Sequence, residues 1–459
     1  MTVTDNVLPL LHPALSREFG GRLVAPGDAD YDALRAVMAG DVDKRPAIIA
    51  RPKTARDVSR AVLFARDNGL ELAVRSGGHS GAGHSATEGG LVIDMREMKA
   101  LAIDVDDRTV WAETGLTAGE VSAAVTERGL VVGFGDAATV GISGITLGGG
   151  VGYLSRKHGL TIDSVLAAEI VTADGSIRTI DADSDSDLFW AIRGAGANFG
   201  VVTRIKYALN PLTAFTGGMM VLPATPETID GFLAAAQAGP RELGTIANVM
   251  PAPPMPFLKP EDHGKPVILA MLAFAGDDTA AQATLKPFRE LATPLADMVK
   301  PGPYMQMYPP EDPSYRPVVV MKNRYLGEIA PGLGATILDR LGEIVGMRAV
   351  QLRVLGGAIA DVAPDVTAYA HRAAPAMAQI VAFVDGPDRA DKLAWVEAAA
   401  AALGPEGSDV AYVNFVGDEG PERVRAAYPG ATWDRLRQVK AKYDPANLFR
   451  LNQNIPPAA

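Results

Sequence analysis

Arg75-Ser76-Gly77-Gly78-His79-Ser80 places one histidine directly after three small residues, and it is the most informative stretch of the chain. It follows Leu70-Glu71-Leu72-Ala73-Val74, whose composition is typical of a strand, so the loop extends from a rigid element. Small residues let the main chain approach a ligand closely and offer N–H groups to a phosphate. We therefore expect a ligand site in which His79 contacts the bound molecule. An ordinary loop histidine is the alternative interpretation.

The order helix, strand, glycine loop occurs twice in the first third of the chain. Thr54 caps the first helix, which ends at Asn68-Gly69. Thr117 and Glu120 form a capping box for the second helix, and Leu130-Val131-Val132 then leads into another glycine loop. These two units predict two loops that hold opposite sides of one long ligand.

The second glycine loop, from Thr139 to Gly152, contains six glycines. Glycines cost backbone entropy on folding, so we expect close approach to a flat ring and a pyrophosphate to require them; a mobile surface loop is the alternative. Gly194-x-Gly196-x-x-x-Gly200 is different, because it follows a predicted helix and precedes a predicted strand. A Rossmann nucleotide site needs strand, turn and helix in that order, so this cluster predicts only a tight turn.

The rest of the chain predicts an α+β protein with two domains. Asp174-Gly175 between two apolar segments predicts a hairpin, and residues 187–193 predict a short amphipathic helix. Beyond Asn210-Pro211 the sequence alternates Pro-rich loops with short apolar segments, which predicts an antiparallel sheet with covering helices over residues 211–411. We expect residues 412–459 to return and complete the domain that residues 1–210 begin.

Composition excludes several classes of function. The chain has 459 residues and a net charge of −11, which argues against nucleic acid and anionic membrane surfaces as partners. No apolar run is long enough to cross a bilayer, and residues 1–6 lack the features of a signal peptide. The sequence contains no cysteine and only six histidines, without a metal-ligand spacing, so we expect no metal site, no thiolate chemistry and a cytoplasmic location.

Further motifs follow the His79 loop in a characteristic order. They are Gly148-Gly149-Gly150-Val151-Gly152-Tyr153-Leu154-Ser155-Arg156-Lys157-His158-Gly159-Leu160, Asp187-Leu188-Phe189-Trp190-Ala191-Ile192-Arg193-Gly194, Asn198-Phe199-Gly200-Val201-Val202-Thr203 and Tyr443-Asp444-Pro445-Ala446-Asn447-Leu448-Phe449-Arg450-Leu451-Asn452-Gln453-Asn454-Ile455. In content, order and spacing the chain resembles the berberine-bridge-enzyme-like FAD-linked oxidases of the vanillyl-alcohol-oxidase, or PCMH-type, superfamily. The match covers the first half and the C-terminal segment well, and the middle loosely.

The resemblance implies a two-part PCMH-type FAD-binding domain with a substrate domain inserted before the C-terminal segment. In the family, the histidine that matches His79 carries the flavin through its 8α-methyl group. Many relatives add a second bond from a cysteine, but that position is Ala137 here, so FAD is expected to have one covalent link. Ser143 stands where relatives usually have glycine, which leaves the path of this loop open. Valine at the position of Val140 accompanies reaction with oxygen in relatives.

The resemblance also points to residues for the chemistry. Tyr412 and Asn414 match the family's Tyr-x-Asn motif, where the tyrosine lies beside the flavin, so Tyr412 is the candidate base; a core tyrosine is the alternative. His371 is a candidate either to bind substrate or to tune Tyr412, with a surface histidine as the alternative. Weaker candidates for substrate or flavin contacts are Tyr153, Tyr304, Gln306, Lys322 and Tyr325.

We expect the cofactor to contact the first glycine loop, the second glycine loop, one strand and the C-terminal segment. The predicted residues are Ser76, Gly77, Gly78, His79, Ser80, Val140, Gly141, Gly144, Gly149, Gly150, Gly152, Val171, Asn414 and Asn452. Val171 would contact the adenine through its main chain. Arg75 is either a charge partner for the pyrophosphate or a brace for its loop. His84 either donates to the cofactor or is a plain loop histidine.

Three functions are compatible with this sequence. The first is a covalent FAD oxidase that acts on a small-molecule alcohol, sugar or amine and reduces molecular oxygen to hydrogen peroxide. The second is an oxidative cyclase or dehydrogenase of secondary metabolism with little oxygen turnover. The third is a flavin-carrying protein with little catalysis. Neither the substrate nor the oligomeric state follows from the sequence.

Overall fold

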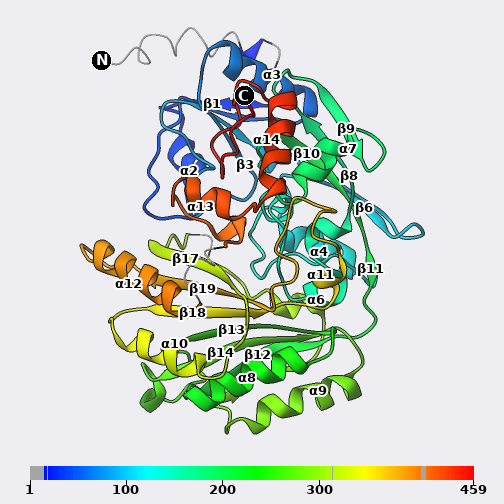
Figure 1. The fold of residues 1–459 in the computed structure, drawn as a ribbon. Coiled ribbons are helices and arrows are strands. Elements are labelled where there is room, and N and C mark those ends of the chain that lie inside the picture. Colours follow the sequence, from blue (N-terminus) through cyan, green and yellow to red (C-terminus); the bar gives the residue numbers. More distant parts are fainter. Residues whose placement is uncertain (1–14, 18, 313, 405–409) are drawn as a thin grey trace.

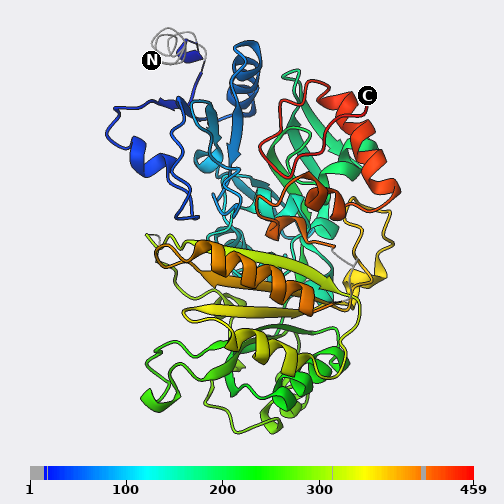
Figure 2. The ribbon, with the colours of Figure 1, turned by 60° about the vertical axis from the view of Figure 1, so that its left-hand side comes forward.

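The computed structural model describes residues 15–17, 19–312, 314–404 and 410–459. Figure 1 shows two parts: strands from the beginning of the chain and helices from its end share the upper part, and the middle of the chain forms the lower part. Figure 2 shows the same division from another side, with helix α12 (Arg389–Ala402) lying along strands of the lower part. This arrangement confirms the predicted α+β fold with an inserted antiparallel-sheet domain.

A small mixed sheet positions the His79 loop. In spatial order its strands are β1 (Arg22–Val24), β2 (Ile48–Arg51), β4 (Leu91–Asp94) and β3 (Leu72–Arg75). Helix α3 (Ala55–Asp67) packs on it through a buried face, and Thr54 and Asp57 form a capping box at its start. Since β3 ends at Arg75, the loop begins where a buried strand stops, one residue later than the sequence predicted.

A second sheet is antiparallel and packs beside the first. Its strands, in spatial order, are β5 (Leu101–Asp104), β6 (Thr109–Glu113), β10 (Val201–Ala208), β8 (Val165–Val171) and β9 (Ile177–Asp181). Strands β8 and β9 form the predicted hairpin, in which Thr172 N donates to Ser176 O and Gly175 has a φ of +81°. Helix α4 (Ala118–Thr126) has the predicted capping box, and β7 (Leu130–Val131) follows it and pairs with β11 (Asn210–Pro211).

The lower part is built on an eight-stranded antiparallel sheet. Along its path the strands are β15 (Ala296–Asp297), β12 (Thr216–Pro223), β14 (Pro266–Phe274), β13 (Leu243–Pro251), β18 (Arg348–Val354), β19 (Ala376–Phe383) and β17 (Val319–Leu326), and β16 (Lys300–Pro301) pairs with β12. Four helices cover one face: α8 (Pro226–Ala238), α9 (Asp278–Glu290), α10 (Leu333–Gly342) and α12. The other face is directed toward the upper part (Figure 1).

The C-terminal segment joins the core of the upper part. Helices α13 (Pro421–Ala426) and α14 (Ala431–Tyr443) contribute Val424, Leu436 and Val439 to one apolar cluster with Val110 and Ile205 of the second sheet. Lys440 and Asp444 are fully buried as an ion pair with an Nζ–Oδ2 distance of 2.7 Å. The end of the chain therefore packs against strands that lie more than 200 residues earlier.

The structure differs from the sequence predictions in two local features. The second glycine segment is not entirely a loop, because α5 (Ile142–Leu147) forms inside it and α6 (Ser155–His158) follows. Helix α7 (Ser186–Ile192) is present, but Leu188 to Ile192 are all buried, so it is a core helix and not an amphipathic one. In both places burial by the surrounding elements outweighs the local sequence pattern.

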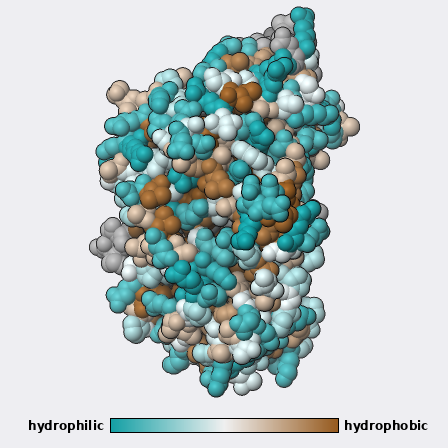
Figure 3. All heavy atoms as spheres, turned by 90° about the vertical axis from the view of Figure 1, so that its right-hand side faces the viewer, coloured by the Kyte–Doolittle hydropathy of each residue, from teal (hydrophilic) through white to brown (hydrophobic). Residues whose placement is uncertain are grey.

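The face in Figure 3 is largely hydrophilic, with hydrophobic side chains in small separate groups. Among the residues that the structure describes, no helix is both long and apolar enough to cross a membrane.

Candidate active site

The two glycine loops meet at Gly77 and Gly141, main chain against main chain. A Cβ atom on Gly77 would lie 2.2 Å from Gly141 N, and one on Gly141 would lie 2.1 Å from Ser76 Oγ. Both positions therefore exclude any side chain. At this contact the loops are direct neighbours, whereas the sequence predicted loops on opposite sides of a ligand.

His79 belongs to a chain of hydrogen bonds that ends at a carboxylate. His79 Nε2 lies 3.0 Å from Thr139 Oγ1, which donates to Glu311 Oε2 at 2.5 Å. Glu311 Oε1 also accepts a hydrogen bond from Ala138 N at 3.0 Å. Burial lowers the pKa of the His79 imidazole, while the charge of Glu311 and a main-chain hydrogen bond at Thr139 oppose this. His79 is therefore a neutral imidazole at pH 7.

The guanidinium of Arg75 is hydrogen-bonded within the protein. Its side chain is 1% exposed, and its guanidinium donates to the main-chain carbonyls of Ser85, Leu34 and Arg35. Burial lowers the pKa of Arg75 to about 10. Of its two predicted roles, these contacts support a brace for the loop and not a charge partner for a pyrophosphate.

Other residues of the first loop also stabilise its path. Ser76 Oγ donates to Thr114 O at 2.5 Å, and Ser80 Oγ accepts from His84 N at 3.3 Å. Gly78 has a φ of +77°, a conformation that favours glycine. Burial lowers the pKa of His84 to about 4, with Lys44 acting in the same direction and Asp418 opposing it. His84 is therefore a neutral, half-buried side chain in this loop.

Most glycines of the second segment are required by packing within the protein. A Cβ on Gly150 would lie 2.0 Å from Thr161 Oγ1, and one on Gly152 would lie 1.7 Å from Phe134 O. On Gly149 it would lie 3.1 Å from carbons of both Tyr369 and Tyr412. The surrounding chain alone accounts for the absence of side chains at these three positions.

Gly144 is different from its neighbours. It lies exposed on α5, and a Cβ there would have nothing within 4 Å. Glycine in a helix interior costs about 0.5–1 kcal/mol relative to alanine. The protein's own packing does not account for this glycine, so it leaves free space where a ligand surface fits. Ser143, next to it, is half-buried and is part of the same helix.

The hydroxyl oxygen of Tyr412 accepts three hydrogen bonds. The donors are Gly150 N at 2.9 Å, Val151 N at 3.3 Å and Asn414 Nδ2 at 2.9 Å. Burial raises the pKa of Tyr412, whereas these donors and the Arg353 charge lower it. Asn414 Nδ2 also donates to Ile145 O at 3.0 Å, so Asn414 joins Tyr412 to α5. The arrangement stabilises negative charge on the phenol oxygen.

Tyr412 belongs to a buried aromatic cluster. The hydroxyls of Tyr325 and Tyr369 lie 2.6 Å apart, and the Tyr369 ring contacts the Tyr412 ring with a centroid distance of 6.2 Å. His371 packs against Tyr325 and Tyr369, and its Nε2 lies 3.0 Å from Ala427 O. Burial lowers the pKa of His371. Its ring contacts to the cluster run through Tyr325 and Tyr369, so any influence on Tyr412 passes through Tyr369.

The remaining predicted cofactor residues lie in three places. Val140 is half-buried beside Gly141, and its carbonyl accepts from Ala118 N at 2.8 Å. Val171 is the last residue of β8 and pairs with both β10 and β9, so its main chain is shared with the sheet. Asn452 Nδ2 donates to Ala197 O and Phe449 O, but its buried Oδ1 accepts no hydrogen bond within the described residues.

The weaker candidates divide into two groups. Tyr325 is part of the aromatic cluster, and Lys322 on the same strand lies 3.7 Å from Glu419. Tyr304, Tyr153 and other apolar residues form a separate cluster with Tyr308. Gln306 Nε2 donates to Gly217 O and Lys300 O, which are main-chain atoms of the lower sheet. The structure therefore joins Tyr325 to Tyr412, but places Tyr304 and Gln306 in structural roles.

Sequence reasoning missed the charged residues that connect the two parts. Arg353 is 4% exposed, and its guanidinium donates to Asp136 Oδ2 at 2.7 Å and Val151 O at 3.1 Å. Glu311 lies in a Pro-rich loop more than 170 residues from its partners. No local pattern marks either residue. Thr139, in contrast, directly precedes Val140, so its proximity to that motif was a usable signal.

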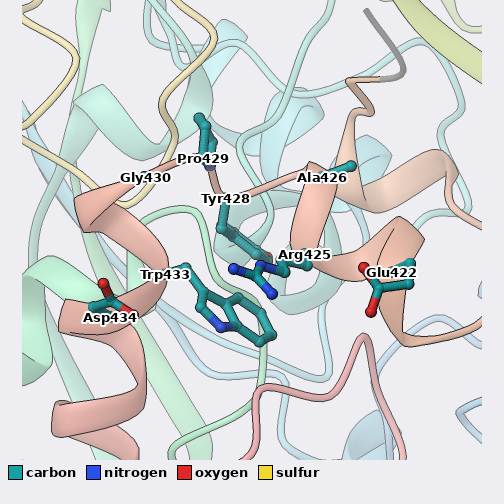
Figure 4. Close-up of a pocket in the computed structure, with 8 residues that line it drawn as sticks. All are labelled: Glu422, Arg425, Ala426, Tyr428, Pro429, Gly430, Trp433 and Asp434. Carbon is teal, nitrogen blue, oxygen red and sulfur yellow. The ribbon is translucent and has the colours of Figure 1, made fainter. Parts of the chain in front are cut away.

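A surface pocket lies elsewhere, between α13 and α14 (Figure 4). Its lining consists of Glu422, Arg425, Ala426, Tyr428, Pro429, Gly430, Trp433 and Asp434. None of the residues predicted for catalysis or cofactor binding belongs to this lining. We therefore place the candidate site at the glycine loops and Tyr412. The described residues also contain no cluster of His, Asp and Glu able to hold a metal ion.

Comparison with known proteins defines the class. A family model described as "FAD binding domain" matches residues 46–181, which include both glycine loops. A second model, "Berberine and berberine like", matches residues 411–456, which include Tyr412. The fold and site are therefore those of a FAD-binding oxidoreductase.

Individual relatives extend over nearly the whole chain. The chain is 31% identical to the FAD-linked oxidoreductase YvdP of Bacillus subtilis over 96% of this chain and 99% of the relative. It is 29% identical to (R)-6-hydroxynicotine oxidase of Paenarthrobacter nicotinovorans over 95% and 97%. The crystal structure of 6-hydroxy-D-nicotine oxidase from Arthrobacter nicotinovorans superimposes with a TM-score of 0.86 at 27% identity, covering 96% and 99%. The chain belongs to the berberine-bridge-enzyme-like FAD-linked oxidoreductases.

The residues present fit this cofactor. Asn452 Oδ1 is a buried acceptor that lacks a donor within the described chain, and Gly144 leaves open space on α5. His79 is neutral and held by Thr139. These features lie on the segments that the FAD-binding and berberine-like models match.

Proposed function

We propose that this protein is an FAD-dependent oxidase with its cofactor attached through His79 alone, acting on an alcohol, sugar or amine carbon. FAD, when bound, takes a hydride from that carbon and delivers the electrons to oxygen, which forms hydrogen peroxide. The observation that carries the covalent assignment is the hydrogen-bond chain from His79 through Thr139 to Glu311. Only a neutral imidazole has a lone pair for bond formation. Ala137 has no thiol, so a second link is not part of the proposal.

The proposed division of labour follows the two parts of the fold. Residues 1–210 and 412–459 bind FAD, and residues 211–411 bind the substrate. The loop of His79 touches the start of α5 at Gly141, Asn414 contacts Ile145 near its end, and Tyr412 is bonded to Gly150 just beyond it. Because a helix rises 1.5 Å per residue, the loop of His79 and the segment of Tyr412 and Asn414 lie roughly 9 Å apart along α5. This separation supports FAD binding along α5.

Tyr412 is the proposed base that removes the proton from the substrate hydroxyl or amine. Three donors on its oxygen stabilise the phenolate that this step requires. Since burial raises the pKa of Tyr412 above its usual value, the phenolate fraction and the rate should increase as pH rises. His371 contacts the ring of Tyr325. We propose that it holds this ring in position where the aromatic cluster contacts the substrate.

The proposed cofactor contacts combine main-chain and side-chain groups from four segments. They are Ser76, Gly77, Gly78, Ser80, His84, Val140, Gly141, Gly144, Gly149, Gly150, Gly152, Val171, Asn414 and Asn452. Gly144 and Asn452 have the strongest support. A Cβ on Gly144 would meet open space, and the buried Oδ1 of Asn452 accepts no hydrogen bond within the described residues.

Denaturation tests the covalent assignment. Flavin fluorescence should remain with the unfolded polypeptide, and intact-mass measurement should show one added FAD. His79→Ala should abolish both signals, whereas the control His263→Ala should keep them. Colour that washes away from the denatured unmodified protein would contradict the assignment. Peroxide production with alcohols, sugars and amines then tests the oxidase activity separately.

A further inference from the structure

Met321 lies where the edge strand β17 of the lower sheet meets the loop that follows His79. Strand β17 is the last strand on the path of this sheet, and Val320 belongs to the apolar cluster beneath the covering helices. Since successive side chains of a strand point to opposite faces, Met321 is on the face directed toward the upper part. A Cβ atom on Gly81 would lie 3.3 Å from Met321 Cε and 3.7 Å from Met321 Sδ. The thioether therefore packs against the main chain of the loop that follows His79.

An amide group also contacts the sulfur of Met321. Gln379 Nε2, on the neighbouring strand β19, lies 3.4 Å from Met321 Sδ and has no other acceptor within the described residues. A thioether sulfur is a weak acceptor, whereas oxidation to a sulfoxide makes this side chain polar. The same amide would therefore bind an oxygen atom added to this sulfur more strongly than it binds the sulfur itself.

Two other methionines provide internal comparisons. Met321 is half-buried, and Gly81 beside it is exposed, so this contact is open to small solutes. Met377 packs with the aromatic cluster but is only 1% exposed, which encloses it. Met298 is 39% exposed but lies between β15 and β16, at the opposite end of the strand path. Of these three methionines, only Met321 is both accessible and close to the proposed cofactor loop.

The proposed reaction supplies an oxidant for this thioether. Hydrogen peroxide is a product of that reaction, and His79, in the adjoining loop, is the proposed point of FAD attachment. Peroxide oxidises a thioether to a sulfoxide. The O–O bond breaks and an S–O bond forms; the sulfur loses two electrons, and the second oxygen leaves with both protons as water. The chain contains no cysteine, so no thiol of the protein competes for the peroxide.

We propose that Met321 is an oxidation site that hydrogen peroxide formed by the protein itself converts to methionine sulfoxide, and that this modification slows the enzyme. The proposal rests on the proposed function, because it needs both FAD at His79 and the reaction with oxygen. The sulfur already lies close to both Gln379 and Gly81, so an added oxygen atom needs space that these groups now fill. The loop therefore shifts when the sulfur is oxidised, and reaction of the bound cofactor with oxygen becomes slower.

Cycles of reduction and reoxidation test the proposal without a known substrate. The FAD-loaded protein is photoreduced with EDTA under anaerobic conditions and reoxidised with air in the dark, with catalase present throughout to remove peroxide from solution. Peptide mass spectrometry then gives the sulfoxide fraction of each methionine. Sulfoxide should accumulate with cycle number at Met321, severalfold above Met298 and Met377. Equal fractions at Met321 and Met298 would overturn the proposal.

Peroxide added to the oxidised protein should reverse this order. Without catalase and without reduction cycles, dissolved hydrogen peroxide should oxidise Met298 at least as fast as Met321, because Met298 is the more exposed of the two. Faster oxidation of Met321 in both experiments would show an intrinsically reactive sulfur and would contradict a local source of peroxide.

Variants link the modification to activity. Met321→Leu has a side chain of similar volume that peroxide does not oxidise, so its rate of reoxidation by oxygen, measured by stopped flow, should stay constant over the cycles. The rate of the unmodified protein should fall in proportion to the sulfoxide fraction at Met321. Met298→Leu is the matched control and should lose rate as the unmodified protein does. An equal loss of rate in Met321→Leu would overturn the effect of this modification on the enzyme.

The same cycles separate this inference from the proposed function. A flavin that stays reduced in air would refute the oxidase function and this inference together. A flavin that air reoxidises, without enrichment of sulfoxide at Met321, would refute the inference and leave the oxidase intact.

Discussion

The proposed cofactor side and the proposed substrate side of this molecule are built in different ways. The cofactor side consists of glycine loops whose main chains touch, as at Gly77 and Gly141, with few side chains between them. The substrate side is a sheet whose side chains strand register brings together, as at Gln379 and Gln351. Main-chain packing tolerates almost no substitution, whereas side chains on one face of a sheet change without disturbing it. The first should therefore fix the cofactor, and the second the substrate.

Removing the Tyr412 hydroxyl should produce the largest effect on turnover. Tyr412→Phe eliminates the proposed base, and the rate of flavin reduction should fall by roughly 10²–10⁴-fold. Stopped-flow bleaching over a pH range measures this. The increase of the unmodified enzyme's rate with pH should disappear in the variant, since burial raises the pKa of this phenol.

Tyr369→Phe is the matched control for this experiment. It removes a hydroxyl from the same cluster, but that hydroxyl bonds only Tyr325 in the described structure. The control should retain most of the activity and its pH dependence. Equal losses in both variants would show that the cluster is structural and that Tyr412 has no special chemical role.

The difference between the two sides also explains what sequence reasoning could find. Gly77, Gly141 and His79 lie within contiguous motifs, because main-chain packing of a loop requires consecutive small residues. The capping residues Thr54 and Thr117 were recognised for the same reason: their partners lie three residues away. Local rules of this kind need no knowledge of the tertiary structure.

Residues that act through tertiary contacts carried no such signal. Asn248 and Gln351 lie 103 positions apart, and Glu311 is 172 positions from Thr139. Only strand register or loop placement brings them together. Arg75 illustrates the converse: its position in the motif left a phosphate contact and a brace for the loop open, and its bonds to carbonyls of neighbouring segments favour the brace. Motifs therefore pointed to the candidate site, and the fold shows which contacts each of these residues makes.

Two glycine variants, one directly before α5 and one within it, test the proposed cofactor side. Gly141→Ala puts a methyl group against Ser76 and Gly77, and should cost about 1–3 kcal/mol of unfolding free energy. Gly144→Ala meets no protein atom, so the apoprotein should be equally stable or about 0.5–1 kcal/mol more stable. Denaturant unfolding measures both.

Flavin content distinguishes a structural glycine from a ligand-facing one. Gly144→Ala should reduce the amount of bound FAD even though the fold is intact, since we propose that FAD occupies the free space on α5. Full FAD content in Gly144→Ala would remove this residue from the proposed site, and Gly141→Ala with unchanged stability would contradict the loop contact.

Glu311 lies in the proposed substrate domain but contacts Ala138 and Thr139 in a loop of the proposed cofactor site. A variant of Glu311 therefore tests whether the two sides act independently. Glu311→Gln keeps an acceptor for Ala138 N but removes the charge at the end of the His79 chain. The fraction of protein with covalent FAD should fall about fivefold, on the scale of one charge-assisted hydrogen bond. Asp312→Asn, its exposed neighbour, is the control and should keep the normal fraction.

Acid should destabilise the protein by a smaller amount, through two neutral histidines that both lie in residues 1–210. Burial lowers the pKa of His158 to about 4, and its buried Nε2 has no hydrogen-bond partner within the described residues. In the unfolded chain the pKa is about 6.5, so protons bind preferentially to the unfolded state below that pH. This histidine's contribution to stability is therefore complete above pH 6.5 and is lost progressively as pH falls toward 4. Because the ring is partly exposed, we expect a loss of about 1 kcal/mol.

Thermal unfolding at pH 7, 5.5 and 4.5 measures this effect. His158→Asn cannot gain the proton, so its melting temperature should fall less with acid than that of the unmodified protein. His84→Gln, in the cofactor loop, should behave similarly, because burial also lowers the pKa of His84 to about 4. If only His84→Gln reduces the acid sensitivity, then the loop of His84 and not α6 controls acid unfolding. Identical acid sensitivity in all three proteins would show that neither histidine is buried in its neutral form.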